Sequence, residues 1–181
     1  VVSRVGSRAV FPARFQLIAA SNPCPCGFLG DAAHACRCSE NQISHYQAKL
    51  GGPLKDRIDL ICEVTRVDPT RVLESGRGTC SARIADEVRA ARERASWRGE
   101  RMESLGNVTP HEVIESCGLS TAGHKLIEDM AHKHFLSGRG IVRILRVART
   151  IADLAGRADI VQADIAEAIN YRSLDRGNWG R

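Results

Sequence analysis

The strongest constraint in the sequence is a group of four cysteines that fall within fifteen residues. They form two Cys-x-Cys pairs, Cys24/Cys26 and Cys36/Cys38, which are separated by nine residues. Two close pairs on one loop can supply four thiolates to a tetrahedral Zn²⁺ ion with no open position, the pattern of a structural site. A bound metal would tether a loop that has no hydrophobic core of its own. The spacing therefore predicts a structural zinc site.

Two other interpretations of these cysteines stay open, namely small buried thiols or a redox pair, because Cys-x-Cys is less usual than Cys-x₂-Cys in zinc sites. His34 and His45 are possible substitute ligands. Among the remaining cysteines, Cys62 and Cys117 fall in apolar patterns and are expected in the core, whereas the sequence is silent on Cys80. Seven cysteines without a secretory signal favour a reducing cytoplasm over a disulfide framework.

The composition of the chain changes near residues 65–80, and this change predicts two structural parts. Residues 1–65 carry short β-like runs with Gly, Pro and Cys between them, whereas residues 81–175 have an almost wholly helical pattern. Residues 66–80 are expected to link the two parts, and residues 176–181 to form a polar tail. Aromatic residues make up only 4% of the chain, so Ala, Val, Ile and Leu must build the core. The predicted fold class is α/β plus all-α.

The first part is expected to contain a hairpin, two further strands and one helix, because short apolar runs alternate there with turn residues. The expected elements are Val1–Arg4 and Ala9–Phe11 (a hairpin around Gly6–Ser7), Phe15–Ala20 (a buried parallel strand), Ser39–Leu50 (a helix capped by Ser39) and Leu60–Val64 (a strand).

The second part is expected to be a bundle of helices, because apolar residues recur there at helical spacing between caps and breakers. The expected helices are Ser81–Arg98, a helix opened by the capping box Thr109–Glu112 and closed at Gly118, a helix from Ser120, a long helix from Ser137 to Gly156, and Ala163–Tyr171.

The charge balance favours contact with polyanions, because the net charge is +5 and Arg is the main cation. Opposite charges alternate along most of the helices, so a solvated surface explains them equally well. No apolar run approaches the roughly 20 residues that a membrane-spanning helix needs, and no signal peptide is visible. Nucleic acid or nucleotide phosphate is therefore the expected partner, and a membrane is not.

Four segments, taken in sequence order, indicate the protein family that the chain resembles. The run FPARFQLIAASNPCPCG (residues 11–27) ends an apolar strand in a lone polar residue, Asn22. The other three are GGPLKDRIDL (51–60), SGRGIVRILRVARTIADLAG (137–156) and VVSRVGSRAVFPARF (1–15). Together with the terminal run YRSLDRGNW, this ordered set resembles the C-terminal portion of Mg-chelatase-like AAA+ ATPases of the ComM/YifB type. The resemblance implies an AAA+ α/β core, with parallel strands, a hairpin and a cysteine-rich loop, followed by a helical lid.

The resemblance also implies a role for particular residues. Asn22 would be the sensor that hydrogen-bonds the γ-phosphate or orients the attacking water. Arg57 would be the finger that reaches the ATP of a neighbouring subunit, where its forked guanidinium stabilises charge on the transferring phosphoryl group. Arg139, in the first turn of its helix, would contact phosphate beside the free N–H groups. Arg4 and Arg8, on the hairpin, would contact DNA phosphates.

Each of these residues also has a purely structural interpretation. Asn22 would cap the turn before Pro23. Arg57 would pair on the surface with Asp56 or Asp59. Arg4 and Arg8 would be edge-strand charges that deter aggregation. Arg139 would belong to a solvated cationic face together with Arg143, Arg146 and Arg149. For Arg143, Arg146 and Arg149 this structural interpretation is preferred.

For the intact protein, the resemblance implies a hexameric ring that uses ATP and Mg²⁺ to move branched DNA during natural transformation. A GxxxxGK[ST] loop and an acidic Walker B strand are absent from this sequence, so the chain alone is not expected to hydrolyse ATP. A magnesium chelatase motor subunit is an alternative, although such motors generally lack the cysteine insertion. A non-enzymatic, zinc-bearing nucleic-acid-binding module is the other.

Overall fold

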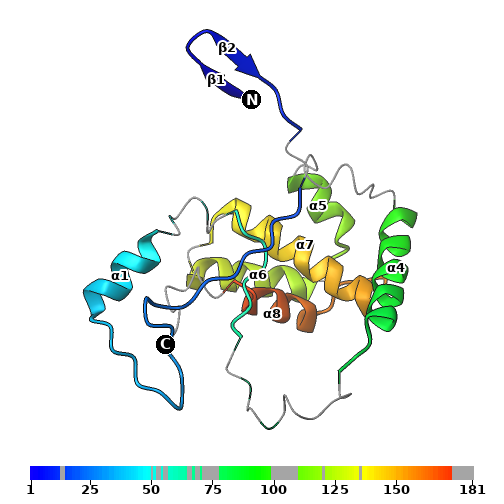
Figure 1. Cartoon of the computed structure of the whole chain (residues 1–181). Coiled ribbons are helices and arrows are strands. Elements are labelled where there is room, and N and C mark those ends of the chain that lie inside the picture. Colours follow the sequence, from blue (N-terminus) through cyan, green and yellow to red (C-terminus); the bar gives the residue numbers. More distant parts are fainter. Residues whose placement is uncertain are drawn as a thin grey trace.

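The described part of the chain consists of a β-hairpin, one separate short helix and a bundle of helices (Figure 1). A computed structural model describes residues 1–12, 15–49, 51, 54, 57–64, 67, 70, 78–98, 110–119, 121–134 and 136–172. The tail at 176–181, Asp56 and most of the expected linker lie outside these residues. Among the described residues, no helix combines the length and the apolar character that crossing a bilayer requires.

The hairpin pairs β1 (Val2–Arg4) with β2 (Ser7–Ala9), and it projects beyond the helices (Figure 1). The chain reverses at Val5–Gly6, where Gly6 has a φ of +85°, a backbone conformation that costs glycine no steric penalty. All six strand residues are exposed. The predicted hairpin is confirmed, with its second strand beginning two residues earlier than expected.

The two other predicted strands do not form. Phe15–Ala20 and Leu60–Val64 are extended but unpaired, because the only sheet among the described residues is the β1–β2 hairpin. A buried parallel strand needs neighbours on both edges, and the described part of the chain offers none to these segments. Phe15 and Ile18 are accordingly 76% and 84% exposed. The expected parallel sheet is therefore not observed, and the α/β part of the predicted fold class is not met by the described residues.

Helix α1 (Glu40–Ala48) stands to one side of the bundle and begins where the sequence predicts (Figure 1). Ser39 caps it: the Ser39 hydroxyl accepts from the Gln42 N–H (3.3 Å), and the Gln42 side chain accepts from the Ser39 N–H (2.9 Å). This reciprocal capping box satisfies two N–H groups that the first turn leaves without helical partners. None of the residues of α1 is buried, so packing does little to hold this helix.

The bundle consists of five helices, and α7 passes through its middle (Figure 1). Their bounds are α4 (Ser81–Trp97), α5 (Pro110–Ser116), α6 (Thr121–His134), α7 (Gly138–Leu154) and α8 (Gln162–Asn170). All five predicted helices are confirmed, including Pro110 in the first turn of α5 and Gly118 at positive φ after its end. Small and aliphatic side chains form the core, as the composition predicts: Val113, Cys117, Ile144, Leu145, Val147, Ala148, Ala152, Ile160, Ile165, Ala168 and Ile169.

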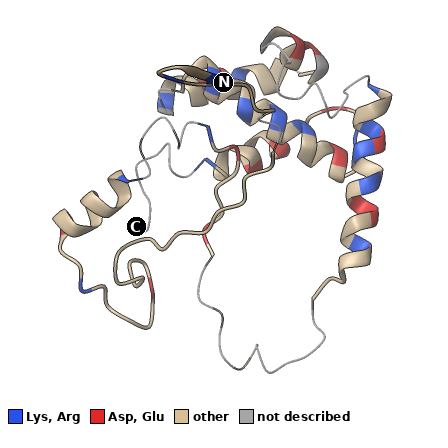
Figure 2. Ribbon diagram, turned by 45° about the horizontal axis from the view of Figure 1, so that its top comes forward, with Lys and Arg blue, Asp and Glu red and all other residues tan. Residues whose placement is uncertain are grey.

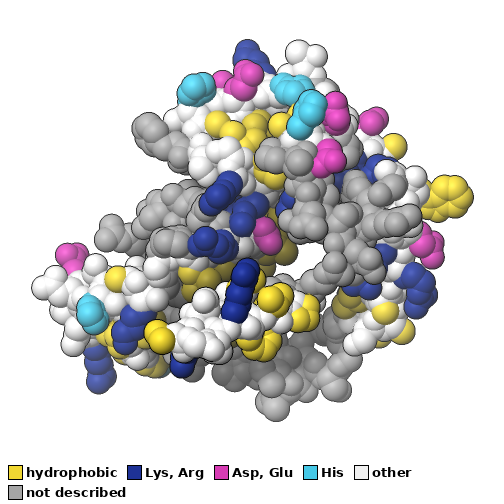
Figure 3. Space-filling model, turned by 90° about the horizontal axis from the view of Figure 1, so that it is seen from above, with side chains coloured by type: hydrophobic (Ala, Val, Ile, Leu, Met, Phe, Trp, Pro, Cys, Tyr) yellow, Lys and Arg dark blue, Asp and Glu magenta, His cyan; other side chains and the backbone are white. Residues whose placement is uncertain are grey.

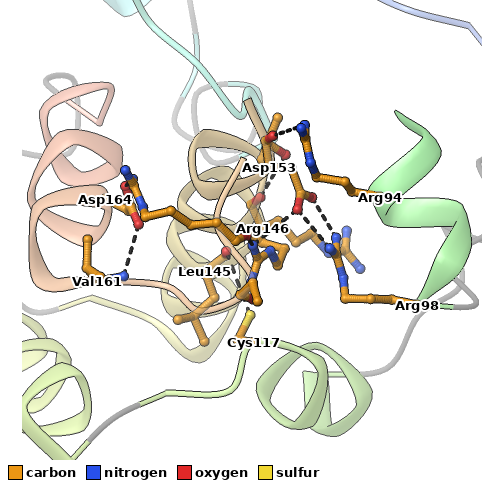
Figure 4. A network of polar contacts seen from close by, with 12 residues as sticks. Arg94, Arg98, Cys117, Leu145, Arg146, Asp153, Val161 and Asp164 are labelled. Carbon is orange, nitrogen blue, oxygen red and sulfur yellow. Dashed lines mark hydrogen bonds and ion pairs between the residues drawn. The ribbon is translucent and has the colours of Figure 1, made fainter. Parts of the chain in front are cut away.

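A buried carboxylate, Asp153, joins α4 to α7 (Figure 4). The Arg98 guanidinium donates two hydrogen bonds to it, at 2.7 and 2.5 Å, and Arg149 donates a third at 3.1 Å. Arg94 donates to the backbone carbonyl of the same residue at 2.8 Å. The Asp153 side chain is only 5% exposed, and a carboxylate can remain charged in such a place only because cations surround it.

The prediction that Arg143, Arg146 and Arg149 form a solvated face is wrong for Arg149. The other two side chains are only partly exposed to solvent. Arg149 is buried, and besides Asp153 it donates to the carbonyls of Arg157 (2.7 Å) and Ala158 (2.6 Å) in the α7–α8 turn. Arg143 and Arg146 are half-buried. A run of arginines in a sequence does not reveal the carbonyls and carboxylates that other segments bring to it, and these acceptors stabilise the buried charge. On α4, by contrast, basic and acidic side chains alternate over an exposed surface (Figure 2).

We expect Asp153→Asn to lower the free energy of unfolding by about 3 kcal/mol, because it leaves the buried cations without their counter-charge. Asp86→Ala is the matched control: it removes an α4 carboxylate from an exposed pair with Arg89 and should cost at most about 1 kcal/mol. Urea unfolding followed by circular dichroism measures both. Equal losses in the two variants would contradict the role given to the buried carboxylate.

The start of α4 is a second site where stability can be tested. Cys80 occupies the N-cap with suitable backbone angles (φ −68°, ψ 148°) but makes no capping hydrogen bond, and the first turn has no acidic residue. We expect Cys80→Asp to stabilise the bundle by about 1 kcal/mol, which corresponds to a thermal midpoint about 2–4 °C higher. Cys80→Ala should leave the midpoint unchanged. A midpoint for Cys80→Asp no higher than that of Cys80→Ala would refute the capping argument.

Candidate functional site

The four clustered cysteines meet at one point, as their spacing predicts. The Sγ atoms of Cys24, Cys26, Cys36 and Cys38 all lie within 4.8 Å of one another. The individual separations are 3.4 Å between Cys24 and Cys26, 3.5 Å between Cys26 and Cys36, and 3.7 Å between Cys24 and Cys36. Four sulfur atoms therefore converge from two short stretches of chain.

These separations match a metal centre better than either alternative. Zinc–sulfur bonds of about 2.3 Å in a tetrahedron place sulfur atoms about 3.8 Å apart, which is close to the values found. A disulfide would require about 2.05 Å, and every cysteine is free. A redox pair would bring two thiols together rather than four. Of these four cysteines only Cys24 is buried, so simple core packing does not explain the group either.

Turns in the backbone hold the cysteine loop in this shape. The Gly27 N–H donates to the Cys24 carbonyl (3.1 Å), and Gly27 adopts a φ of +81°, which favours glycine. Further along, the Asp31 carboxylate accepts from the N–H groups of Ala33 (2.7 Å) and His34 (3.0 Å). The first turn carries the first cysteine pair and the second lies between the two pairs, so together they fold the second pair back onto the first.

The pKa values of Cys26, Cys36 and Cys38 depart from the ordinary thiol value in different directions. Hydrogen bonds with the backbone at Phe28 and Arg37 lower the pKa of Cys26 to about 6. A backbone hydrogen bond at Cys38 lowers the pKa of Cys36, but desolvation and the neighbouring thiols outweigh it and raise that pKa to about 12. Desolvation is the main cause that raises the pKa of Cys38. One thiolate thus forms readily, and a cation is needed to stabilise the others, so metal affinity should fall as the pH falls.

The remaining sulfur and histidine predictions have mixed outcomes. The metal-ligating group found among the described residues contains neither His34 nor His45; His34 instead stacks on Phe28, with ring centroids 5.1 Å apart. Cys117 is buried in the bundle, as predicted, but the prediction for Cys62 is wrong, since that side chain is exposed. Its expected strand never forms, so no sheet covers it.

Asn22 lies immediately before the cysteine loop and is exposed. Its side-chain amide lies near Gly27: a Cβ added to that glycine would lie 3.9 Å from the Asn22 Cγ and Nδ2 atoms. The predicted position at the end of a parallel strand is not observed, because the preceding residues are unpaired. The structure therefore places Asn22 with the cysteine loop.

Arg57 is exposed and ends a turn in which its N–H donates to the Leu54 carbonyl (2.9 Å). Asp59, one of its two predicted surface partners, lies 3.5 Å from Arg143 of α7. The other predicted partner, Asp56, lies outside the described residues.

Residues 57–61, here named the docked segment, are held against the bundle. Besides the Asp59–Arg143 pair, the Ile58 carbonyl accepts from the Arg172 guanidinium (2.9 Å). The Ile61 N–H donates to the Tyr171 carbonyl (3.0 Å). Sequence reasoning missed these contacts, because no local pattern links residues more than eighty positions apart. The one hint in the sequence was an arginine, Arg172, directly after the last predicted helix. In the structure this side chain is buried.

Arg139 lies in the first turn of α7 and is exposed. The Ser137 hydroxyl caps this turn by accepting from the Gly140 N–H (3.2 Å). The helix therefore starts where predicted, although two glycines, Gly138 and Gly140, stand on either side of Arg139. Arg139 and Arg143 are four residues apart and thus share a helix face. Because Arg143 contacts Asp59, the docked segment reaches α7 one helical turn from Arg139.

Arg4 and Arg8 are exposed on the hairpin but do not share a face. Arg8 pairs with Ser3 across the hairpin, and directly opposed residues point to the same side. Arg4 follows Ser3 along the strand and therefore points to the other side. On the face seen from above, basic side chains gather near the middle beside exposed hydrophobic ones (Figure 3).

We expect the purified chain to bind one Zn²⁺ ion, measured by elemental analysis of protein expressed without added zinc. Cys24→Ser should abolish stoichiometric binding, whereas Cys62→Ser, which removes an exposed thiol outside the cluster, should not. Chelation should also release four additional thiols to a thiol-specific reagent, because metal-bound thiolates react slowly. Four thiols of this loop that react equally fast with and without a chelator would rule out the metal centre.

Comparison with known protein families gives two matches in sequence order. A family model described as magnesium chelatase, subunit ChlI, matches residues 1–72, and one described as magnesium chelatase, subunit ChlI C-terminal, matches residues 78–172. The second match alone covers more than half of the chain, and it includes all the helices of the bundle.

Curated relatives agree with these matches. The chain is 37% identical over 177 residues to the competence protein ComM of Haemophilus influenzae and 35% identical over 176 residues to the uncharacterized protein YifB of Salmonella typhimurium. An uncharacterized protein of Mycobacterium bovis is 33% identical over 166 residues. The matches cover 97%, 97% and 91% of this chain but only 34%, 34% and 32% of the relatives, so the chain spans about a third of their length. With both regions matched in family order, the chain belongs to the magnesium chelatase ChlI family, on its ComM- and YifB-like side.

Proposed function

We propose that this chain is the phosphate-sensing part of an AAA+ ATPase of the ComM type that couples ATP hydrolysis to the remodelling of DNA. The observation that carries the proposal is the placement of Arg57: it is exposed, on a segment docked against the face of α7 that carries Arg139. Two exposed arginines, one on α7 and one on the segment docked to it, suit contact with phosphate groups of a neighbouring subunit.

Each proposed contact has a chemical reason. The Arg57 guanidinium is planar and always charged, so it can stabilise negative charge on a transferring phosphoryl group in a neighbour's site. Arg139 adds a mobile cation to the N-terminus of a helix, where free N–H groups already favour anions. The Asn22 amide can donate a hydrogen bond to a γ-phosphate oxygen or orient the attacking water. Movement of the helical lid would be the mechanical step.

The part that cradles ATP and Mg²⁺ would come from elsewhere in the protein. The relatives are about three times as long as this chain, and the sequence holds no GxxxxGK[ST] loop. The exposed apolar run at residues 15–18 supports this proposal, because such a run is stable as a strand when a larger sheet pairs with it. We therefore propose that the 181 residues alone do not hydrolyse ATP.

The proposed partners are DNA and further copies of the protein in a ring, expected to be a hexamer. The net charge of +5 and the exposed Arg4 and Arg8 support the DNA contact. The name of the Haemophilus relative suggests a role in competence, and hence natural transformation, for this protein as well. Zinc is proposed as a structural cofactor, and the free thiols suit a reducing cytoplasm.

Two alternatives make different predictions. A magnesium chelatase motor is suggested by the family description, but a four-cysteine loop has no evident use in metal insertion into a porphyrin. A zinc-bearing nucleic-acid-binding module is favoured by the cysteine cluster and the basic hairpin. The module would bind DNA in a salt-sensitive way that does not depend on ATP.

We expect Arg57→Ala in the full-length protein to lower kcat for ATP hydrolysis about 10³-fold, with assembly unchanged. Arg57→Lys should restore little, because an ammonium lacks the fork of donors. Arg83→Ala, which removes an exposed arginine of α4, is the control and should keep normal turnover. Turnover assays with size-exclusion chromatography measure both properties. Normal turnover by Arg57→Ala would refute the proposed motor role.

A further inference from the structure

The cysteine loop lies between two elements whose relative position it controls. Asn22 stands two residues before Cys24, the first ligand. At the other end, Cys38 directly precedes Ser39, the N-cap of α1. A metal held by the two cysteine pairs would therefore join the chain at Asn22 to the start of α1 through a single ion.

On one side, the Asn22 amide lies near the turn that carries the first cysteine pair. Its Cγ and Nδ2 atoms lie 3.9 Å from the point that a Cβ on Gly27 would occupy. Gly27 directly follows Cys26, and its N–H closes the turn onto Cys24. The surroundings of the amide are therefore set by the turn that holds Cys24 and Cys26.

On the other side, α1 returns to the same place. The Gln47 side chain, in the last turn of α1, donates to the Pro23 carbonyl at 3.1 Å. Pro23 stands between Asn22 and Cys24. With four thiolates on one ion, the chain forms a closed ring that runs from Pro23 through the loop and α1 and back through Gln47.

Without a metal, little would hold this ring together. Helix α1 has nine residues, none of them buried, and isolated helices of that length are marginal in water. Within the loop, only Cys24 is buried. The free energy that orders such a loop must come mainly from ligation, so the placement of Asn22 depends on the same ligation.

We propose that metal binding by Cys24, Cys26, Cys36 and Cys38 positions the Asn22 amide, so that the metal centre is a positioning element for the phosphate sensor. The inference rests on the proposed role of Asn22, because only in that role does its placement affect turnover. A polar group that contacts reacting atoms must be held within roughly 0.5 Å to act. Loss of metal would then impair ATP hydrolysis in the full-length protein without touching a nucleotide ligand.

The test follows the Asn22 side chain itself. The ¹⁵N-labelled 181-residue chain is stripped with a chelator and titrated with Zn²⁺, and the side-chain NH₂ resonances are recorded, with Asn22→Asp used for assignment. We expect the Asn22 pair to shift and sharpen up to one equivalent of zinc. The pair from Asn170, at the end of α8, should not change, and backbone signals of Ala148 and Ala152 report that the bundle stays folded.

Three variants separate the contribution of metal ligation from that of the Gln47–Pro23 hydrogen bond. Cys38→Ser should leave the Asn22 resonances as in the metal-free chain, and Cys62→Ser should behave as the unmodified chain. Gln47→Ala should bind one zinc but leave the Asn22 resonances broader, because it removes the hydrogen bond to the Pro23 carbonyl. The same Asn22 spectrum with and without bound zinc would overturn the inference, as would failure to bind zinc. The proposed motor function fails on a different result, normal turnover of Arg57→Ala, since no nucleotide is present in this experiment.

Discussion

The buried carboxylate of Asp153 fixes the arrangement of the helical bundle, because it lies where water hardly reaches it. A carboxylate in such a place costs several kcal/mol unless cations meet it, and it receives Arg98 from α4 and Arg149 from α7. Because the two arginines come from different helices, the charge fixes how α4 lies against α7. Arg149 also holds the carbonyls of the α7–α8 turn, and this single group of contacts therefore sets the positions of three helices.

The two parts of the chain are stabilised in different ways. In the bundle, small aliphatic side chains bury one another and charged groups are paired inside. In the first part almost every large apolar side chain is exposed, and the structure rests on turns, caps and converging sulfur atoms. The docked segment joins the parts through the Asp59–Arg143 pair and through Arg172. These contacts are polar, whereas the helices of the bundle are held mainly by buried apolar side chains.

Local sequence signals predicted what depends on local chemistry. Ser39, Ser137 and Pro110 mark helix starts because each satisfies or avoids an unpaired N–H in the first turn, and Gly118 marks an end because it alone adopts positive φ at low cost. The cysteine cluster was predictable for the same reason, since ligand spacing is a local property. The strand at Phe15–Ala20 was wrong because a strand is defined by neighbours that its own sequence does not contain. The burial of Arg149 was not predicted for the same reason, because its acceptors lie in other segments. The Asp59–Arg143 pair, which holds the docked segment on α7, was not predicted either.

The acidity of Cys26 bears on how this protein must be handled. With a pKa near 6, this thiol is ionised at neutral pH while it lies 3.4 Å from the sulfur of Cys24. An ionised sulfur so close to a second thiol is readily oxidised by air or peroxide to a sulfenate and then to a cystine bridge. Such a bridge consumes two of the four ligands, and a sample kept without reductant loses its capacity for metal while its helical content hardly changes. The storage history of a preparation thus decides which form of the molecule is studied.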